Sequence, residues 1–178
     1  MSEEYILTPP IKTMEDAFSV KGKNVVITGG NRGIGRGITQ AFAESGANIV
    51  ILCRNESSGK KACEEIAHFG GRYECIPCEI SNHDSVIEAA KKTYEFFDYI
   101  DVLVNNAGVA TTTPLLDPNG LNEWERVVNT DLNGLAYVIY EFVPKMIEAK
   151  RGGEIINISS IGAVSVSGCK QHHDAPYN

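Results

Sequence analysis

A glycine-rich stretch from Thr28 to Gly35 has residue types and spacing that suit phosphate binding. Glycine lets a backbone turn tightly and approach a pyrophosphate, because no Cβ stands in the way. The stretch follows an apolar run over residues 24–27 and opens an amphipathic segment over residues 34–45. A helix starting there would present unpaired N–H groups and a partial positive charge to an anion. A strand, a glycine turn and a helix in this order predict a dinucleotide-binding site, although glycines that serve only helix–strand packing are the alternative.

The end of the next predicted strand bears on which dinucleotide is bound. An NAD enzyme places an acid near this point, where it binds the ribose 2′-hydroxyl, but here the strand closes on Cys53 and Arg54 follows. Arg32, inside the glycine stretch, could reach the same region, and guanidinium groups bind phosphate oxygens through a planar fork. We therefore predict that NADP(H) is preferred over NAD(H); two solvated surface charges are the alternative interpretation.

Further candidate ligands lie where the predicted strands end, because ligands of open α/β sheets bind outside the carboxyl ends of the strands. The candidate cofactor-binding residues are Thr28, Gly29, Asn31, Arg32, Gly33, Ile34 and Gly35 in the glycine stretch, Arg54 and Asn55, Glu79 and Ile80, and Asn106, Ala107 and Gly108. Glu79 could accept a hydrogen bond from an adenine amino group, or it could be an ordinary loop acid.

A parallel sheet would hold these residues along one edge, and the rest of the sequence predicts such a sheet. Apolar, β-branched runs of strand length alternate with helical patterns, and the near-continuous apolarity of the runs suggests a sheet covered on both faces. The predicted strands are 25–28, 49–53, 73–78, 102–105 and 155–159, and the predicted helices are 34–45, 58–69, 85–97 and 122–149. The alternation implies right-handed βαβ units. We predict a single α/β domain with a parallel sheet covered by helices on both faces.

Charge and composition limit the classes of partner. The formal net charge of −7 over 178 residues argues against a general surface for nucleic acid or for an anionic membrane. No apolar run approaches the ~20 residues of a membrane-spanning helix, and the acidic N-terminus lacks the apolar core of a secretory signal. We expect a cytoplasmic protein that acts on a small molecule, with no nucleic-acid or membrane partner.

The five cysteines predict neither a disulfide framework nor a metal site. Cys75 and Cys78 have the spacing of a redox motif, but they fall in a predicted strand rather than at a helix start, where a thiolate would be stabilised. No second pair of cysteines or histidines completes a zinc site. We interpret Cys75 and Cys78 as ordinary strand residues.

Four segments together resemble the short-chain dehydrogenases/reductases. They are the glycine stretch, residues 105–108 (Asn-Asn-Ala-Gly), residues 157–160 (Asn-Ile-Ser-Ser) and Tyr177, and the resemblance runs from about Gly22 to Asn178. It implies a doubly wound fold, a nicotinamide cofactor, and hydride transfer between a carbonyl and an alcohol. It also implies a homodimer or homotetramer, as is usual in the family.

The resemblance implies catalytic roles for Ser160 and Tyr177. In the family the serine hydrogen-bonds the carbonyl oxygen and the tyrosine gives or takes the proton, while the asparagine-rich stretch lines the cofactor site. The chemistry agrees, because hydride delivery to a carbonyl leaves an alkoxide that needs a donor and a proton source. A free tyrosine has a pKa of about 10, and a neighbouring cation favours its ionised form. The family supplies this cation with a lysine four residues after the tyrosine and with the nicotinamide.

The chain departs from the family pattern in length. It stops at Asn178, before that lysine could appear. We therefore expect it to be the N-terminal part of a chain of roughly 250 residues. In this interpretation residues 1–22 are an N-terminal extension, and residues 23–178 are a Rossmann-type NADP(H)-binding domain without its C-terminal portion.

Two further departures concern the catalytic residues. The family's catalytic asparagine aligns with Asp131, which could accept a hydrogen bond from a relay water but cannot donate one as an amide does. Ser160 and Tyr177 also lie farther apart than is usual, which indicates an insertion within residues 163–175 that would lie over the substrate. Its adjacent His172 and His173 are poorly placed to share a metal ion, so we favour a solvated loop and predict no metal site.

These observations predict an NADP(H)-dependent carbonyl reductase or alcohol dehydrogenase. The Asp131 variant resembles the polyol and ketose reductases of the family, and with the polar insertion it makes a ketose or polyol the first choice of substrate. A hydroxysteroid or a 3-oxoacyl thioester is the alternative, because one fold hosts many functions. A non-catalytic NADP(H)-binding sensor or scaffold is an alternative of another class, and a purely structural αβ domain is a third.

Overall fold

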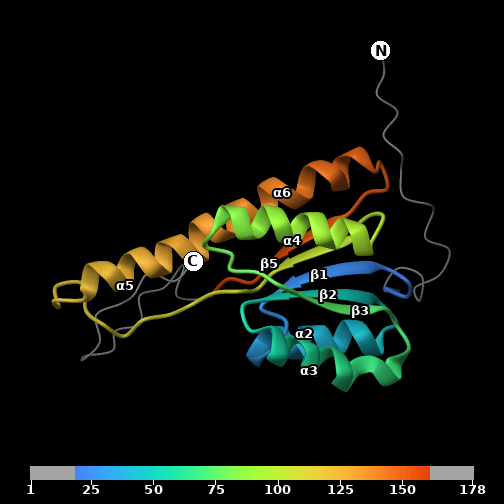
Figure 1. Cartoon of the computed structure of the whole chain (residues 1–178), viewed down its shortest axis with the longest axis horizontal. Helices are drawn as coiled ribbons and strands as arrows, with labels where there is room; N and C mark the ends of the chain where they lie inside the picture. The colour runs from blue at the N-terminus through green and yellow to red at the C-terminus, as the bar shows by residue number, and fades with distance from the viewer. Residues whose placement is uncertain (1–18, 161–178) are drawn as a thin grey trace, which may run out of the picture.

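The computed structural model describes residues 19–160, in which parallel strands form one sheet with helices on both faces (Figure 1). The strands are β1 (Asn24–Thr28), β2 (Asn48–Cys53), β3 (Tyr73–Pro77), β4 (Val102–Asn105) and β5 (Glu154–Asn157). The helices are α2 (Gly33–Glu44), α3 (Glu56–Ile66), α4 (His83–Phe96), α5 (Gly120–Val127) and α6 (Leu135–Glu148), with a 3₁₀ turn η1 (Ala67–Phe69) and a π-helical turn η2 (Val128–Gly134). The predicted Rossmann-like α/β fold is confirmed.

The strand order places a switch point in the middle of the sheet. The order is β3-β2-β1-β4-β5, and every neighbouring pair is parallel. The chain builds outward from β1 to β3 and then returns to add β4 on the other side of β1. The order therefore reverses between β1 and β4, which is where ligands bind in doubly wound sheets.

Alternate strand residues face two separate apolar layers, because successive side chains of a strand point to opposite faces. Toward α2 and α3 the buried layer includes Val25, Ile27, Ile49, Ile51, Val104, Ala43, Ala62 and Ile66. Toward α4 and α6 it includes Val26, Val50, Leu52, Ile76, Leu103, Val86, Val138 and Phe142. Figure 1 shows the two pairs of helices on opposite sides of the sheet. The strands are apolar at nearly every position because each face of the sheet packs against its own layer of helices, as predicted.

The structure differs from the sequence prediction at element boundaries. The single helix predicted over 122–149 is divided into α5, η2 and α6, because a π turn interrupts the regular hydrogen-bond pattern at residues 128–134. Strand β3 ends at Pro77, one residue earlier than predicted. The helices of the described part fall short, in length or in apolarity, of what a bilayer crossing requires. The division predicted between residues 1–22 and 23–178 stays a prediction, since most of the first segment lies outside the described residues.

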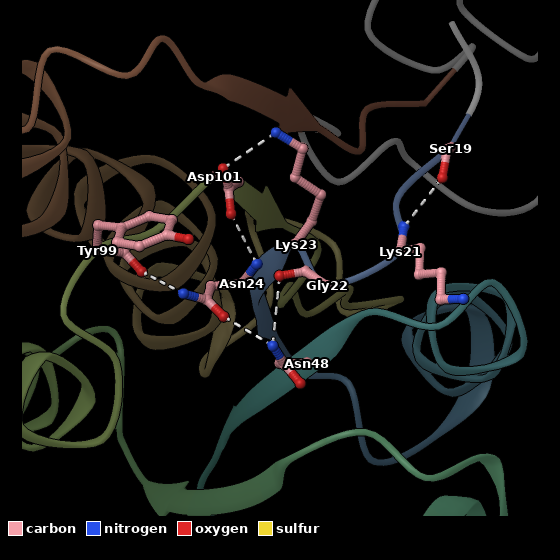
Figure 2. A network of polar contacts seen from close by, with 8 residues as sticks. All are labelled: Ser19, Lys21, Gly22, Lys23, Asn24, Asn48, Tyr99 and Asp101. Carbon is pink, nitrogen blue, oxygen red and sulfur yellow. Dashed lines mark hydrogen bonds and ion pairs between the residues drawn. The ribbon is translucent and has the colours of Figure 1, made fainter. Parts of the chain in front are cut away.

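A polar network joins the amino-terminal ends of β1, β2 and β4 (Figure 2). The buried Asp101 carboxylate accepts hydrogen bonds from the Asn24 backbone N–H at 2.8 Å and from Lys23 Nζ at 3.2 Å. Asn24 Nδ2 donates to the Tyr99 carbonyl at 3.0 Å, and Asn48 Nδ2 donates to Asn24 Oδ1 at 3.0 Å. Contacts at the starts of β1, β2 and β4 therefore fix how these strands are aligned, and with it where they end.

Replacing Asp101 with alanine should lower the free energy of unfolding by about 2–4 kcal/mol, because a buried backbone N–H would lose its acceptor. Asp101→Asn keeps an acceptor and should cost less. Lys23→Met removes only the half-exposed partner and should cost less than about 1 kcal/mol. Urea unfolding of the three variants measures the ranking. Equal losses for Lys23→Met and Asp101→Ala would contradict this account of the network.

Candidate functional site

A pocket of about 600 Å³ lies at the carboxyl ends of the strands, beside the start of α2. Every candidate cofactor residue except Thr28 lines it: Gly29, Asn31, Arg32, Gly33, Ile34, Gly35, Arg54, Asn55, Glu79, Ile80, Asn106, Ala107 and Gly108. The remaining lining residues are Cys53, Ser58, Cys78, Val109 and Thr130. The structure thus brings the candidates together around one cavity, while their binding of a nucleotide stays a prediction.

Thr28 lies beneath the pocket and joins the ends of β1 and β4. Its buried hydroxyl oxygen accepts hydrogen bonds from the backbone N–H groups of Asn106 and Ala107, both at 2.9 Å. In return, Asn106 Nδ2 donates to the Thr28 carbonyl at 3.0 Å. These bonds hold the two strand ends together across the switch point, so the loops that line the pocket start from fixed positions.

Two features of the glycine stretch require glycine. Gly29 and Gly33 have φ angles of +67° and +53°, a region that disfavours residues with a Cβ. A Cβ on Gly35 would overlap the carbonyl oxygen of Gly29 and the side-chain amide of Asn106. The start of α2 therefore packs directly against the backbone of the turn, and no larger side chain fits at Gly35.

The N-terminus of α2 differs from those of α3 and α4. Those helices begin with asparagine caps, in which Asn55 Oδ1 accepts from Ser58 N and Asn82 Oδ1 accepts from Ser85 N. Both also have an acid in the first turn, whereas α2 has neither a side-chain cap nor an acid there. Its first backbone N–H groups and its positive helix end face the pocket with no acidic side chain of the first turn to compete. This arrangement fits the pyrophosphate of a dinucleotide.

Cationic side chains stand at the pocket rim near the end of β2. The Arg54 side chain is 60% exposed and its Nη1 lies 3.5 Å from Glu79 Oε2; Arg32 is also exposed. An ion pair this exposed contributes at most about 1 kcal/mol, so Arg54 could exchange Glu79 for a phosphate at little cost. Strand β2 itself ends in Cys53 and offers no carboxylate for a ribose hydroxyl. The rim therefore suits a 2′-phosphate.

Glu79 is already engaged by neighbouring groups. Its Oε1 accepts a hydrogen bond from Ser81 Oγ at 3.0 Å, and its backbone N–H donates to Ser85 Oγ at 3.0 Å. These contacts fix the loop after β3 at the pocket edge. A further hydrogen bond from an adenine amino group to this carboxylate stays a prediction.

Asp131 lies in η2 and holds the loop that follows β4. Its carboxylate Oδ1 accepts a hydrogen bond from the Val109 backbone N–H at 2.8 Å, and the residue is only 8% exposed. Arg126 on α5 donates to the Ala110 carbonyl at 3.1 Å in the same loop. In the structure, the Asp131 carboxylate positions the backbone at Val109, which lines the pocket, by accepting this hydrogen bond. The catalytic role predicted for it stays a prediction.

The two remaining catalytic candidates are only partly placed by the structure. Ser160 follows β5 and is exposed at the carboxyl edge of the sheet. Strand β5 is held to β4 by Asn105 Nδ2, which donates to Asn157 Oδ1, and by Ile158 N, which donates to the Asn105 carbonyl, both at 2.9 Å. Tyr177 and the predicted insertion at 163–175 lie outside the described residues.

Some lining residues were not predicted as ligands. Ser58 accepts a hydrogen bond from Asn31 Nδ2 at 2.8 Å, which ties the glycine turn to the start of α3. Asn55, three residues before Ser58, is an N-cap residue of the kind that marks a helix start in a sequence. Val109 and Thr130 reach the pocket only through tertiary packing, for which the sequence has no local signal. Among residues 19–160 no cluster of three or more His, Cys, Asp or Glu side chains is placed to hold a metal ion.

Comparison with known sequences identifies related enzymes. The family model described as short chain dehydrogenase matches residues 23–172. The 3-oxoacyl-(acyl-carrier-protein) reductase FabG of Chlamydia pneumoniae is 38% identical over 82% of this chain and 58% of its own length. L-rhamnose 1-dehydrogenase (NAD(P)(+)) of Azotobacter vinelandii is 37% identical over 86% of this chain and 61% of its own length. Sorbose reductase SOU1 of Candida albicans is 32% identical over 92% of this chain and 57% of its own length. The chain thus spans about three fifths of the length of these relatives.

Solved structures share the fold at similar coverage. A short-chain type dehydrogenase/reductase from Mycobacterium marinum superposes with a TM-score of 0.82 at 29% identity, over 88% of this chain and 61% of that one. A metagenomic short-chain oxidoreductase in complex with NADP has a TM-score of 0.76 at 34% identity, over 84% of this chain and 67% of that one. A short chain dehydrogenase/reductase from Burkholderia phymatum in complex with NAD has a TM-score of 0.79 at 26% identity, over 84% of this chain and 53% of that one. With its glycine turn, switch-point pocket and matching family model, the chain belongs to the short-chain dehydrogenase family.

Proposed function

We propose that this chain forms the nucleotide-binding part of an NADP(H)-dependent oxidoreductase that moves a hydride between nicotinamide and a carbonyl or secondary alcohol. The observation that carries the proposal is the pocket at the switch point. There the glycine turn and the N-terminus of α2 meet the ends of β2 and β4, with no acid in the first turn of the helix. The names of the related enzymes, which are reductases and dehydrogenases, support the reaction class.

The preference for NADP(H) rests on the chain's own residues, because the related structures include complexes with NADP as well as one with NAD. Cys53 stands where a carboxylate would bind the ribose 2′-hydroxyl. Arg54 and the exposed Arg32 provide guanidinium groups at the rim for a 2′-phosphate. In this proposal Arg54 leaves Glu79 when the phosphate binds.

The proposed roles of the catalytic residues follow from the charge that develops on the substrate. The nicotinamide, when bound, supplies or accepts the hydride. Ser160 donates a hydrogen bond to the carbonyl oxygen, and Tyr177 gives the proton that neutralises the alkoxide. Asp131 holds Val109 and so positions the loop after β4 that lines the pocket.

The substrate proposed is a ketose or a polyol. The names of the sorbose reductase and the rhamnose dehydrogenase among the relatives support this choice. The FabG relative supports the alternative of a 3-oxoacyl thioester, and a hydroxysteroid is a further alternative. A panel of ketoses, hydroxysteroid ketones and a 3-oxoacyl thioester with NADPH separates them. Tight NADPH binding without turnover of any of them would favour a sensor or scaffold.

The proposal extends to a cytoplasmic homodimer or homotetramer. Apolar side chains stand exposed on η2 and α6, including Leu132, Tyr140 and Ile147. A face of this kind suits burial against a second copy of the chain.

Gly35→Ala tests the glycine turn. The added Cβ would push the start of α2 away from Gly29 and Asn106, so NADPH affinity should fall at least about tenfold. Isothermal titration calorimetry measures the affinity, and circular dichroism checks the fold. Gly37→Ala is the matched control, because it lies on the same helix with open space around it. It should leave binding unchanged; equal losses in the two variants would contradict the role of Gly35.

Arg54→Asp tests cofactor choice. The change removes a guanidinium and adds an acid beside the position of the ribose, so the ratio of NADPH to NADH affinity should fall by about tenfold or more. Lys61→Asp makes the same change of charge on the exposed surface of α3, outside the pocket lining, and should leave the ratio unchanged. A ratio that is unaffected in Arg54→Asp would mean that Arg54 does not contact the 2′-phosphate.

Tyr177→Phe tests the proton source. Removal of the phenolic hydroxyl should lower kcat by about 10²–10⁴-fold and leave NADPH affinity nearly unchanged. Tyr99→Phe removes the same hydroxyl at a position outside the pocket lining; it serves as control and should keep its turnover. Wild-type-like kcat in Tyr177→Phe would assign the proton to another group.

A further inference from the structure

Two cysteines from neighbouring strands meet under the pocket floor. Cys53 Sγ of β2 and Cys75 Sγ of β3 lie 3.7 Å apart, and both residues are 5% exposed. In the parallel register Cys53 pairs with Pro77, so Cys75 lies two residues earlier on the same face. A Cβ on Gly59 of α3 would meet both sulfur atoms, which shows that the helix crosses directly over them. A disulfide needs the sulfurs to approach by about 1.6 Å, to its bond length of about 2.05 Å.

The surroundings make Cys53 the reactive member of the pair. The hydrogen bond from Cys75 lowers the pKa of Cys53 below that of an ordinary thiol, against the effect of burial. The same hydrogen bond, followed by burial, raises the pKa of Cys75. Burial raises the pKa values of Cys63 and Cys78 to about 11. Because the thiolate is the nucleophile, Cys53 should react first among the cysteines in residues 19–160.

Cys53 is also the member of the pair that lines the nucleotide pocket. Cys75 lines a separate hollow of about 350 Å³ beside β3 and α4. A molecule as small as a peroxide can enter a pocket of about 600 Å³. A dinucleotide bound there would cover Cys53.

We propose that Cys53 and Cys75 form a reversible disulfide when a peroxide enters the empty pocket, and that this disulfide weakens nucleotide binding. The Cys53 thiolate attacks one oxygen of hydrogen peroxide, the O–O bond breaks, and Cys53 becomes a sulfenic acid with loss of hydroxide. The Cys75 thiol then loses its proton and attacks the Cys53 sulfur, which forms the S–S bond and releases the second oxygen as water. In sum, two thiols and one peroxide give one disulfide and two waters.

The first oxidation step also favours the second. Ionised Cys53 raises the pKa of Cys75 through its hydrogen bond and its charge. The sulfenic acid of Cys53 is neutral, so the effect of its charge on the pKa of Cys75 is removed once Cys53 is oxidised, while burial continues to raise that pKa. Cys75 closes the disulfide as its thiol loses the proton.

The effect on binding rests on the proposed nucleotide site and follows from the neighbours of Cys53. Arg54 and Asn55 come directly after Cys53 and line the pocket. Cys53 Sγ donates a hydrogen bond to the Asn55 carbonyl at 3.3 Å, and Asn55 caps α3. Drawing the sulfur toward β3 breaks this bond and shifts the end of β2, which moves Arg54 away from the 2′-phosphate.

Peroxide treatment of the reduced protein, followed by non-reducing peptide mapping, tests the first half of the proposal. We expect a peptide linked through Cys53 and Cys75, and we expect dithiothreitol to reverse the link. Oxidation should be at least about tenfold slower at saturating NADPH, because few protein molecules then have an unoccupied pocket. Cys75→Ser should stop at a dimedone-reactive sulfenic acid on Cys53. Cys63→Ser is the matched control and should still form the disulfide. Oxidation that links other cysteines, or none, would overturn the proposal.

Calorimetric titration with NADPH tests the second half. The oxidised protein should bind at least about tenfold more weakly than the reduced protein, and Cys75→Ser should bind equally before and after peroxide followed by a mild reductant. Unchanged affinity in the disulfide form would overturn the coupling alone. Absence of NADPH binding by the reduced protein would refute the nucleotide site and the coupling, whereas the disulfide seen by peptide mapping would still stand.

Discussion

The candidate site depends on the hydrogen bonds between Thr28 and the residues that follow β4. In a parallel sheet the strands diverge as they twist, and the two strands at the switch point have loops that leave in opposite directions. One buried hydroxyl accepts two backbone N–H groups, and Asn106 returns a bond to the Thr28 carbonyl. The turn at Gly29 and the loop at Ala107 are thereby held in contact. Without this link, neither the close approach of α2 nor the cavity beside it would be defined.

The loop after β4 is held from two sides. Thr28 holds the start of the loop, and the carboxylate of Asp131 accepts from Val109. Acceptance of a hydrogen bond is a task that aspartate and asparagine share. The π turn around Asp131 brings the carboxylate to this loop, since it displaces residues 128–134 from regular α-helical positions.

The features that could be predicted from sequence are those that depend on neighbouring residues in the chain. The strands, the glycine turn and the helix starts follow from apolar runs and from backbone constraints at single residues. The contacts that could not be predicted join residues far apart in sequence. Spacing associates Cys75 with Cys78, but in the structure its sulfur lies against Cys53 on the adjacent strand. The hydrogen bond that the Asp131 carboxylate accepts from the Val109 backbone N–H joins two segments 22 residues apart. Both depend on strand order and helix geometry, which no local pattern encodes.

Different residues hold the sheet together and stand at the pocket rim. Asp101 and Asn24 join the strands at one end and Thr28 links two of them at the other, while Arg54 is largely exposed and forms an ion pair with Glu79. Substitutions at Arg54 should therefore be nearly neutral for folding, and under the role proposed for Arg54 selection could act on them for cofactor choice. A lineage could in this way drift between the two nicotinamide pools of a cell without passing through unstable intermediates. The same separation offers a protein engineer a position to randomise without first stabilising the scaffold.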